Sequence, residues 1–316
     1  MATANQIKTL VKSHFEDNNE KFNTVALQIA AHEAKLGHTT LANDLRQLID
    51  NGKKSAIRLR PLNPDLHNLV LEVSPDKRLS DLIVQSSIKE RINRIINEYV
   101  HKDKLLRHSL ENRRKILFSG PPGTGKTMSA SIIANELRLP IYVILMDKVV
   151  TKYMGETSAK LRQIFDIIID RPGVYLFDEF DAIGSQRGKD NDVGEMRRVL
   201  NSFLQFLERD KSESLIIAAT NNLEVLDQAL FRRFDDVIHY NYPSDEEKML
   251  LLKSRFGSNI SNKELKLLLP KLESLSHAEI NQACMDAIKE SVLNNLLISS
   301  ALIEKTIQER IMAYKI

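Results

Sequence analysis

The chain has 316 residues, which is enough for two or three domains with buried cores. Its 45 Lys and Arg residues nearly balance 42 Asp and Glu residues, for a formal net charge of +3. This balance excludes a global electrostatic field for binding polyanions. A single cysteine, Cys284, excludes an intramolecular disulfide and fits a reducing compartment. Because no apolar run is long enough for a signal peptide or a membrane span, we expect a soluble, cytoplasmic protein.

The N-terminal segment shows helical periodicity. Apolar residues recur at three- and four-residue spacing in three successive stripes, and Gly37 and Asn51-Gly52 stand where helices would end. We therefore predict an N-terminal helical recognition domain over residues 1–52. Residues 53–78 carry several proline-containing pairs around a short apolar run, Leu69–Val73, which predicts a linker with one short strand.

Residues 79–242 alternate short apolar runs with helical segments, a pattern typical of a parallel sheet with helices on both faces. The predicted strands are Lys115–Ser119, Ile141–Leu145, Val174–Asp178, Leu215–Thr220 and Asp236–Tyr240. After Pro243 the pattern is helical, which predicts a helical lid over residues 243–316. The expected fold class is α/β, with a C-terminal helical lid and a small N-terminal helical domain.

The segment Gly120–Thr127 reads GPPGTGKT and directly follows the first predicted strand, so it fits the pattern of a phosphate-binding P-loop. Its glycines let the backbone curl so that N–H groups can surround a phosphate at the N-terminus of the next helix. Lys126 can reach the β- and γ-phosphates, and the Thr127 hydroxyl can ligate Mg²⁺. The predicted nucleotide contacts here are Gly120, Pro121, Pro122, Gly123, Thr124, Gly125, Lys126, Thr127 and Met128.

Two adjacent carboxylates, Asp178 and Glu179, end the apolar run that begins at Val174. Asp178 would join Thr127 in holding the metal ion, and Glu179 would polarise a water molecule for attack on the γ-phosphate. A solvated strand end is the alternative, but two acids that close such an apolar run are costly without a role. The two motifs together predict an enzyme that hydrolyses ATP with Mg²⁺.

Three further residues join the P-loop and the acidic pair in one set of motifs. The strand Leu215–Thr220 delivers Asn221 beside the strand of the acidic pair, and Arg232 and Arg233 follow. In this order and spacing the motifs resemble the AAA+ ATPases of the AAA family proper, which includes katanin, spastin and the proteasomal ATPases. The resemblance covers about residues 79–316. It implies that Asn221 is a sensor orienting the attacking water, and that both arginines are fingers acting on a neighbouring subunit of a homo-hexamer.

Two further stretches resemble motifs of this family, one in the helical cap and one before the first core strand. Ser276–Ile280 reads SHAEI where the family usually has S-G-A-[DE]-[IL], so His277 replaces a glycine and leaves the local backbone conformation open. The match makes Ala278 an expected nucleotide contact. The stretch Asp81–Ile83 resembles the segment that wraps adenine, and Ile83 is either a purine contact or a simple core residue.

Lys152, Tyr153, Met154 and Gly155 stand where the family carries its first pore loop, which grips polypeptide in the central channel of the ring. Tyrosine offers a large amphipathic face, methionine adapts to irregular side chains, and glycine permits a sharp bend. A buried Tyr–Met pair is the alternative, but the flanking polar residues favour an exposed loop. Residues 184–195 fall where the second pore loop lies.

These features favour an ATP-driven ring that remodels proteins, with the N-terminal helices recruiting a protein substrate or adaptor. The N-terminal pattern also resembles bacterial ATPases that pair with a subtilisin-like protease in plasmid-exclusion and phage-defence systems, which would make such a protease a partner. Nucleic acid is not an expected partner. The alternative, a nucleic-acid motor or loader, would predict a basic pore tip and an arginine at Ala278. A scaffold that binds ATP without turnover is disfavoured because the full catalytic set is present.

Overall fold

The chain is described from a computed structural model. The structure describes residues 8–9, 12–13, 19–35, 38, 41–44, 69–151, 154–183, 192–223, 231–257 and 260–313. The chain divides into two compact units, Met1–Pro61 and Leu62–Ile316. The boundaries of the predicted domains stay a prediction, because this division separates only the N-terminal unit from the rest.

The N-terminal unit contains helix α2 (Asn19–Lys35). Val25, Ala26 and Ala30 are buried along one stripe of this helix, as expected for an amphipathic helix that packs against a partner. Most of the other two predicted helices lies outside the described residues.

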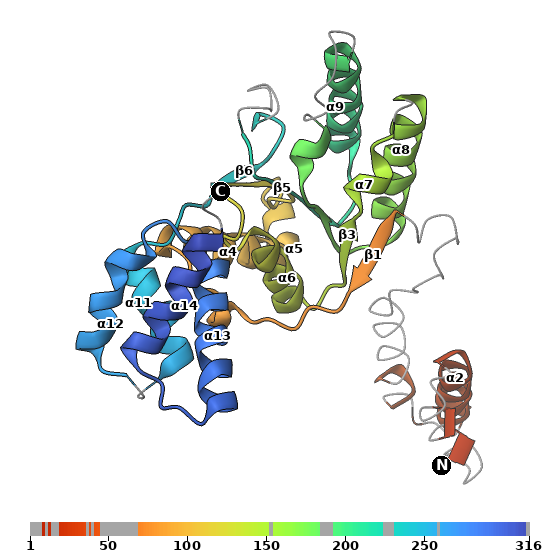
Figure 1. Cartoon of the computed structure of the whole chain (residues 1–316). Coiled ribbons are helices and arrows are strands. Elements are labelled where there is room, and N and C mark those ends of the chain that lie inside the picture. Colours follow the sequence, from red (N-terminus) through yellow and green to blue (C-terminus); the bar gives the residue numbers. More distant parts are fainter. Residues whose placement is uncertain are drawn as a thin grey trace. The chain divides into compact units, whose positions relative to one another are not determined.

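The second unit is built on a six-stranded sheet with the strand order β1-β3-β4-β5-β2-β6 (Figure 1). Its strands are β1 (Val70–Val73), β2 (Lys115–Ser119), β3 (Ile141–Ile144), β4 (Val174–Phe177), β5 (Leu215–Thr220) and β6 (Asp236–His239). All pairs from β3 to β6 are parallel, so the predicted α/β class with a parallel sheet is confirmed. β5 lies between β4 and β2, which places the ends of the three strands that carry the predicted catalytic motifs at one edge of the sheet.

The strand β1 lies in the segment predicted as a linker with one short strand. It pairs antiparallel with β3, with Val70 opposite Ile144, a partner that the sequence analysis did not assign. The outer side chains of β1 at Leu71 and Val73 are exposed. Sequence could not supply this pairing, because a four-residue strand has no local feature that selects its neighbour.

The buried strands send alternate side chains to two separate hydrophobic clusters. In β4, Val174 and Leu176 join the cluster formed with α4 and α6, whereas Tyr175 and Phe177 join the cluster formed with α8 and α9. Both sets are fully buried, which explains why the strand reads as a continuous apolar run. The helices and 3₁₀ helices of this part are η1 (Leu79–Asp81), α4 (Ser86–Val100), α5 (Lys102–Leu106), α6 (Lys126–Leu137), α7 (Met146–Val149), α8 (Met154–Asp170), η2 (Phe180–Ile183) and α9 (Asp192–Arg209).

The C-terminal part is a bundle of helices with its own hydrophobic cluster (Figure 1). Its elements are α11 (Asp245–Phe256), α12 (Asn262–Leu268), η3 (Leu269–Leu272), α13 (His277–Asn294) and α14 (Ser300–Ala313). α11, α12 and α13 each begin with a serine N-cap and a glutamate three residues later, which form a capping box. Within the described residues, no helix is long and apolar enough to cross a bilayer.

Candidate nucleotide-hydrolysis site

The P-loop connects the end of β2 to the start of α6. Gly120 and Gly123 have φ values of 141° and 73°, in the region that favours glycine. A Cβ at Gly120 would lie 2.1 Å from the Tyr240 carbonyl oxygen, and one at Gly123 would lie 2.5 Å from the Ser276 hydroxyl oxygen. The loop therefore needs these glycines for its own curvature and for its close approach to β6 and to the lid.

Lys126, the first residue of α6, is nearly buried within this loop. Its ammonium group donates hydrogen bonds to the Gly120 and Pro121 carbonyl oxygens, at 2.7 and 2.8 Å. Burial lowers the pKa of Lys126, and the nearby carboxylates of Asp178 and Asp181 oppose that change. The arrangement holds a cation at the loop, as a phosphate-binding site requires.

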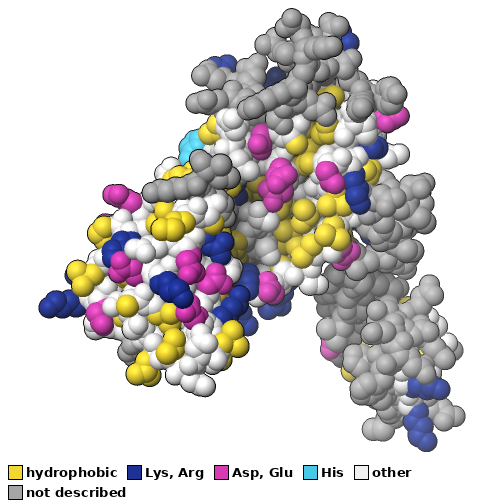
Figure 2. Space-filling model, in the orientation of Figure 1, with side chains coloured by type: hydrophobic (Ala, Val, Ile, Leu, Met, Phe, Trp, Pro, Cys, Tyr) yellow, Lys and Arg dark blue, Asp and Glu magenta, His cyan; other side chains and the backbone are white. Residues whose placement is uncertain are grey.

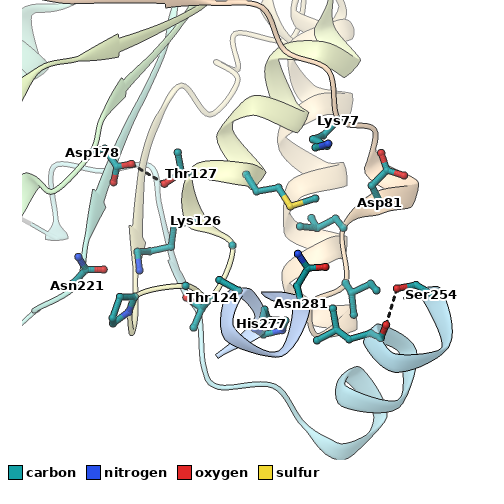
Figure 3. A pocket seen from close by; sticks show the side chains of 18 of the residues that line it. Lys77, Asp81, Thr124, Lys126, Thr127, Asp178, Asn221, Ser254, His277 and Asn281 are labelled. Atoms are coloured by element: carbon teal, nitrogen blue, oxygen red, sulfur yellow. Dashed lines mark hydrogen bonds between the residues drawn. The ribbon is translucent and has the colours of Figure 1, made fainter. Parts of the chain in front are cut away.

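The acidic pair follows the end of β4, which is separated from the P-loop strand β2 by β5. The Thr127 hydroxyl donates a hydrogen bond of 2.7 Å to a carboxylate oxygen of Asp178 (Figure 3). These hard oxygen donors fit a Mg²⁺ ion, which prefers a few carboxylate or hydroxyl ligands together with phosphate oxygens. Glu179 is exposed and has φ of 51°, an uncommon value for a residue with a side chain. A residue held in this conformation beside a pocket is typical of a functional site.

Asn221 stands at the end of β5, beside the strand that carries the acidic pair. Its backbone N–H donates to the carboxylate of Asp181 at 3.3 Å, and the hydroxyl of Thr220 donates to the same oxygen. Asp181 therefore ties the segment after the acidic pair to the end of β5. This residue was missed in the sequence, although a third acid two positions after Glu179 was a visible signal.

Most of the P-loop, the acidic pair and Asn221 line one cavity of about 590 Å³, a size that suits a nucleotide (Figure 3). We call one side of it the P-loop wall: Pro122, Gly123, Thr124, Gly125, Lys126, Thr127, Met128, Asp178, Glu179 and Asn221. The opposite side is the lid wall: Leu251, Ser254, Arg255, His277, Ala278 and Asn281. Lys77 and Asp81–Ile83 complete the lining. The predicted contacts Gly120 and Pro121 do not line the cavity but accept hydrogen bonds from Lys126.

Ile83 agrees with both interpretations that the sequence left open, because it lines the cavity and also packs against the hydrophobic cluster of the lid. Ala278 reaches the P-loop directly, since its backbone N–H donates to the Gly123 carbonyl oxygen at 3.0 Å. The P-loop and the lid thus contact each other through two residues that both line the cavity.

The structure shows the backbone conformation at His277, which the sequence left open. This residue begins α13 directly after the N-cap Ser276, whose hydroxyl accepts a hydrogen bond from the Glu279 backbone N–H. A histidine is tolerated because the first position of a helix has negative φ and needs no glycine. Its Nε2 lies 3.3 Å from a carboxylate oxygen of the buried Glu247, and its Nδ1 is buried without a hydrogen-bond partner among the described residues.

The lid wall contains residues that were not predicted from the sequence, namely Leu251, Ser254, Arg255 and Asn281. The sequence feature that could have indicated them is their spacing along predicted helices. His277 and Asn281 are one helical turn apart and so lie on the same face of α13 as Ala278. That spacing alone could not show which neighbour the face would meet.

Arg232 and Arg233 lie outside the cavity, in the turn that precedes β6. The register pairs Asp236 with Ile116 near the start of β2, whereas the P-loop follows the end of that strand. A five-residue strand spans about 16 Å, so the two arginines lie at the far edge of the sheet from their own P-loop. Arg233 forms an ion pair with Glu208 of α9.

The predicted pore loop is only partly described. Lys152, Tyr153 and the side chain of Met154 lie outside the described residues. The backbone of Met154 and Gly155 forms the first turn of α8, which begins earlier than the expected start near Thr157. Gly155 is exposed there, and a Cβ added to it would meet no atom within 4 Å. In the second predicted pore loop, residues 184–191 lie outside the described residues and α9 begins at Asp192.

Comparisons with known proteins place this site in a family. Residues 116–242 match the family described as "ATPase family associated with various cellular activities (AAA)". The chain is 32% identical over 317 residues to the AAA family ATPase y4kL of Sinorhizobium fredii, with 98% of this chain and 93% of that protein covered. It is also 34% identical over 185 residues to a putative 26S proteasome regulatory subunit homolog of Methanothermobacter marburgensis, covering 58% of this chain and 49% of that protein.

The fold agrees with a solved structure, the crystal structure of the FIGL-1 AAA domain. That structure superimposes with a TM-score of 0.62 and 20% sequence identity, covering 81% of this chain and 96% of the other. The chain spans about half the length of the methanogen relative. Sequence identity over nearly the full length of the rhizobial protein shows that this chain belongs to the AAA family of ATPases, enzymes that hydrolyse ATP.

Proposed function

We propose that the cavity binds ATP between the P-loop wall and the lid wall, and that Glu179 acts as the general base of hydrolysis. The observation that supports this proposal most directly is the single cavity lined by the P-loop, the acidic pair, Asn221 and the lid. The P-loop backbone and Lys126 would hold the phosphates. The base and ribose would then lie between Ile83 and the lid wall.

The proposed reaction uses residues in separate roles. Glu179 would accept a proton from a water molecule while the water oxygen bonds to the γ-phosphorus. The bond from that phosphorus to the β,γ-bridging oxygen breaks, and ADP and phosphate leave. Asn221 would orient the water, and Thr127 and Asp178 would hold a Mg²⁺ ion, which neutralises charge on the phosphates.

Replacing the proposed base tests this role. Glu179→Gln keeps the shape of the side chain but removes its basicity, so hydrolysis should fall by at least ~10²-fold while ATP still binds. Glu213→Gln, which changes an exposed acid paired with Lys102 far from the cavity, serves as the control. A near-normal hydrolysis rate in Glu179→Gln, measured by phosphate release, would rule out the assignment.

We further propose that the active form is a ring, with a homo-hexamer as the expected assembly. The support is geometric, because Arg232 and Arg233 lie at the far edge of the sheet from their own P-loop and so suit action on a neighbour. The double variant Arg232→Ala/Arg233→Ala should be inactive alone but regain hydrolysis when mixed with Lys126→Ala protein. Co-assembly without any rescue would argue against action between subunits.

For the substrate, we propose a polypeptide that is remodelled through the ring pore, recruited by the N-terminal helical unit. A relative named as a proteasome regulatory subunit homolog supports a protein substrate, and a subtilisin-like protease is one partner that this activity would serve. Tyr153→Ala should leave basal ATP hydrolysis within a few-fold of normal. It should abolish remodelling of the polypeptide substrates, which can be identified as those that the Glu179→Gln protein retains. Tyr153→Phe should be tolerated, because the ring supplies most of the contact area.

The same experiments distinguish a nucleic-acid motor. Over the lid face in Figure 2, basic side chains alternate with acidic ones, in keeping with ion pairs such as Arg310–Asp286 and Lys305–Glu290. A surface of mixed sign gives little attraction for a phosphate backbone. DNA or RNA that stimulated hydrolysis in a salt-sensitive, Lys152-dependent way would overturn the remodelling proposal.

A further inference from the structure

The lid wall carries one side-chain amide, that of Asn281, whose oxygen has a hydrogen-bond partner and whose nitrogen has none among the described residues. Asn281 is partly buried on α13 and lines the cavity together with Ala278 and His277. Its side chain projects from α13 into the space enclosed by the lining residues in Figure 3. The residue therefore lies at the end of the cavity opposite the P-loop wall, where the base or ribose of a nucleotide would be held.

The contact between Asn281 and Arg255 fixes the orientation of this amide. The Arg255 Nε donates a hydrogen bond of 2.6 Å to Asn281 Oδ1. A guanidinium has donors only, so the atom facing it must be the oxygen of the amide and not its nitrogen. The Asn281 NH₂ group then points away from Arg255, and no partner for it occurs within the described part of the chain.

An amide NH₂ group is a donor with no acceptor capacity, so it selects a ligand atom that accepts. A purine base presents such acceptors on its ring nitrogens. The other side chains around this end of the cavity include apolar Leu82, Ile83 and Leu251, which would cover the faces of a flat ring but cannot read its edge. The amide of Asn281 is suited to read that edge.

We propose that Asn281, with its amide held in orientation by Arg255, donates a hydrogen bond to a ring nitrogen of the purine base and so contributes to recognition of that base. Asn281 contacts the ligand, whereas Arg255 is a positioning residue that acts through it. The inference rests on the proposed nucleotide site and adds to it the chemistry that recognises the base.

The test measures binding of ADP and of its 1-deaza, 3-deaza and 7-deaza analogues to the full chain by calorimetry. Each analogue replaces one ring nitrogen by C–H and leaves the phosphates unchanged. The wild-type protein should bind one of the three about 3- to 10-fold more weakly than ADP, the range expected for one lost hydrogen bond. In Asn281→Leu, ADP should weaken by a similar factor, and that analogue should no longer differ from ADP.

Further variants separate recognition from folding. Asn281→Asp has nearly the same shape and still accepts from Arg255 but cannot donate, so it should lose the same discrimination. Arg255→Met should reduce the discrimination, and Arg255→Lys, which keeps a donor, should restore part of it. Gln282→Leu is the matched control, because this neighbouring amide bonds to Asp286 and does not line the cavity.

Two outcomes would overturn the inference while leaving the nucleotide site intact. One is equal binding of ADP and all three analogues by the wild-type protein. The other is discrimination that persists unchanged in both Asn281→Leu and Asn281→Asp. Failure of the wild-type protein to bind any of these nucleotides would instead reject the proposed site itself.

Discussion

The P-loop wall and the lid wall of the cavity differ in how the chain supplies their atoms. Most of the P-loop wall comes from one continuous segment, Pro122–Met128, in which the backbone itself curls around the expected phosphate. The lid wall comes from side chains of two helices, α11 and α13, that approach only in the folded bundle. A phosphate site can thus be encoded locally, whereas the proposed site for the base depends on packing between helices.

The two walls also rest on separate hydrophobic clusters. The P-loop lies over the cluster formed by β2, α4 and α6, and the lid has a cluster of its own. The walls meet where the Ala278 N–H donates to the Gly123 carbonyl oxygen. This hydrogen bond joins the two walls directly.

The largest effect should come from breaking the lid cluster alone. Leu252 is fully buried there, so Leu252→Ala should lower the free energy of unfolding of the lid by about 2–5 kcal/mol. Hydrogen exchange should show faster opening of α11 and α13 with little change in β2 and β5. The control is Leu293→Ala, whose side chain is exposed and should change stability by less than about 0.5 kcal/mol. Equal loss of protection in the sheet would show that the two clusters unfold together.

A smaller effect should follow from forcing the two walls apart. Gly123→Ala places a Cβ 2.5 Å from the Ser276 hydroxyl oxygen, so we expect nucleotide affinity to fall by about 10-fold, equivalent to ~1.4 kcal/mol. Gly257→Ala is the matched control, because Gly257 also has positive φ but has nothing within 4 Å of an added Cβ. If both variants bound nucleotide equally well, the contact between the walls would carry no binding energy.

The smallest effect concerns the pH dependence of the lid. Burial of Glu247 disfavours its charged form, but hydrogen bonds from His277 and Ser244 outweigh burial and lower its pKa below the usual 4.5. The ionised carboxylate therefore stabilises the fold above that pH, and the stabilisation is lost as the pH falls through the lowered pKa. Glu247→Gln should reduce the melting temperature at pH 7, and the difference from wild type should shrink toward pH 3. A constant difference across this range would contradict the assignment.

The elements of the sheet were predictable to within one residue because their signal is local. β2 and β5 match their predicted bounds, and β3, β4 and β6 each end one residue earlier than expected. A strand buried on both faces must be apolar throughout, so it is visible as a continuous run. The edge strand β1 was also visible as a strand, but its antiparallel partner was not.

The residues of the candidate site likewise divide into those that local motifs predict and those that only the folded chain reveals. Pro122–Met128, Asp178, Glu179 and Asn221 were identified from short motifs, and the structure brings them to one cavity. The start of α8 at Met154 was not anticipated, because Gly155 reads as a helix breaker in isolation. The roles of Arg232, Arg233 and Tyr153 stay predictions that the variants above can test.

The sequence by itself determined the family of this protein, the order of its strands and helices along the chain, and the groups that would meet a phosphate. These properties depend on residues that are adjacent or one helical turn apart, so spacing alone reveals them. Only the tertiary structure decided that β1 pairs with β3, that Asp181 holds the end of β5, and that Arg255 orients Asn281. Such contacts join residues far apart in the chain, and their partners are chosen by packing of whole elements rather than by any local pattern.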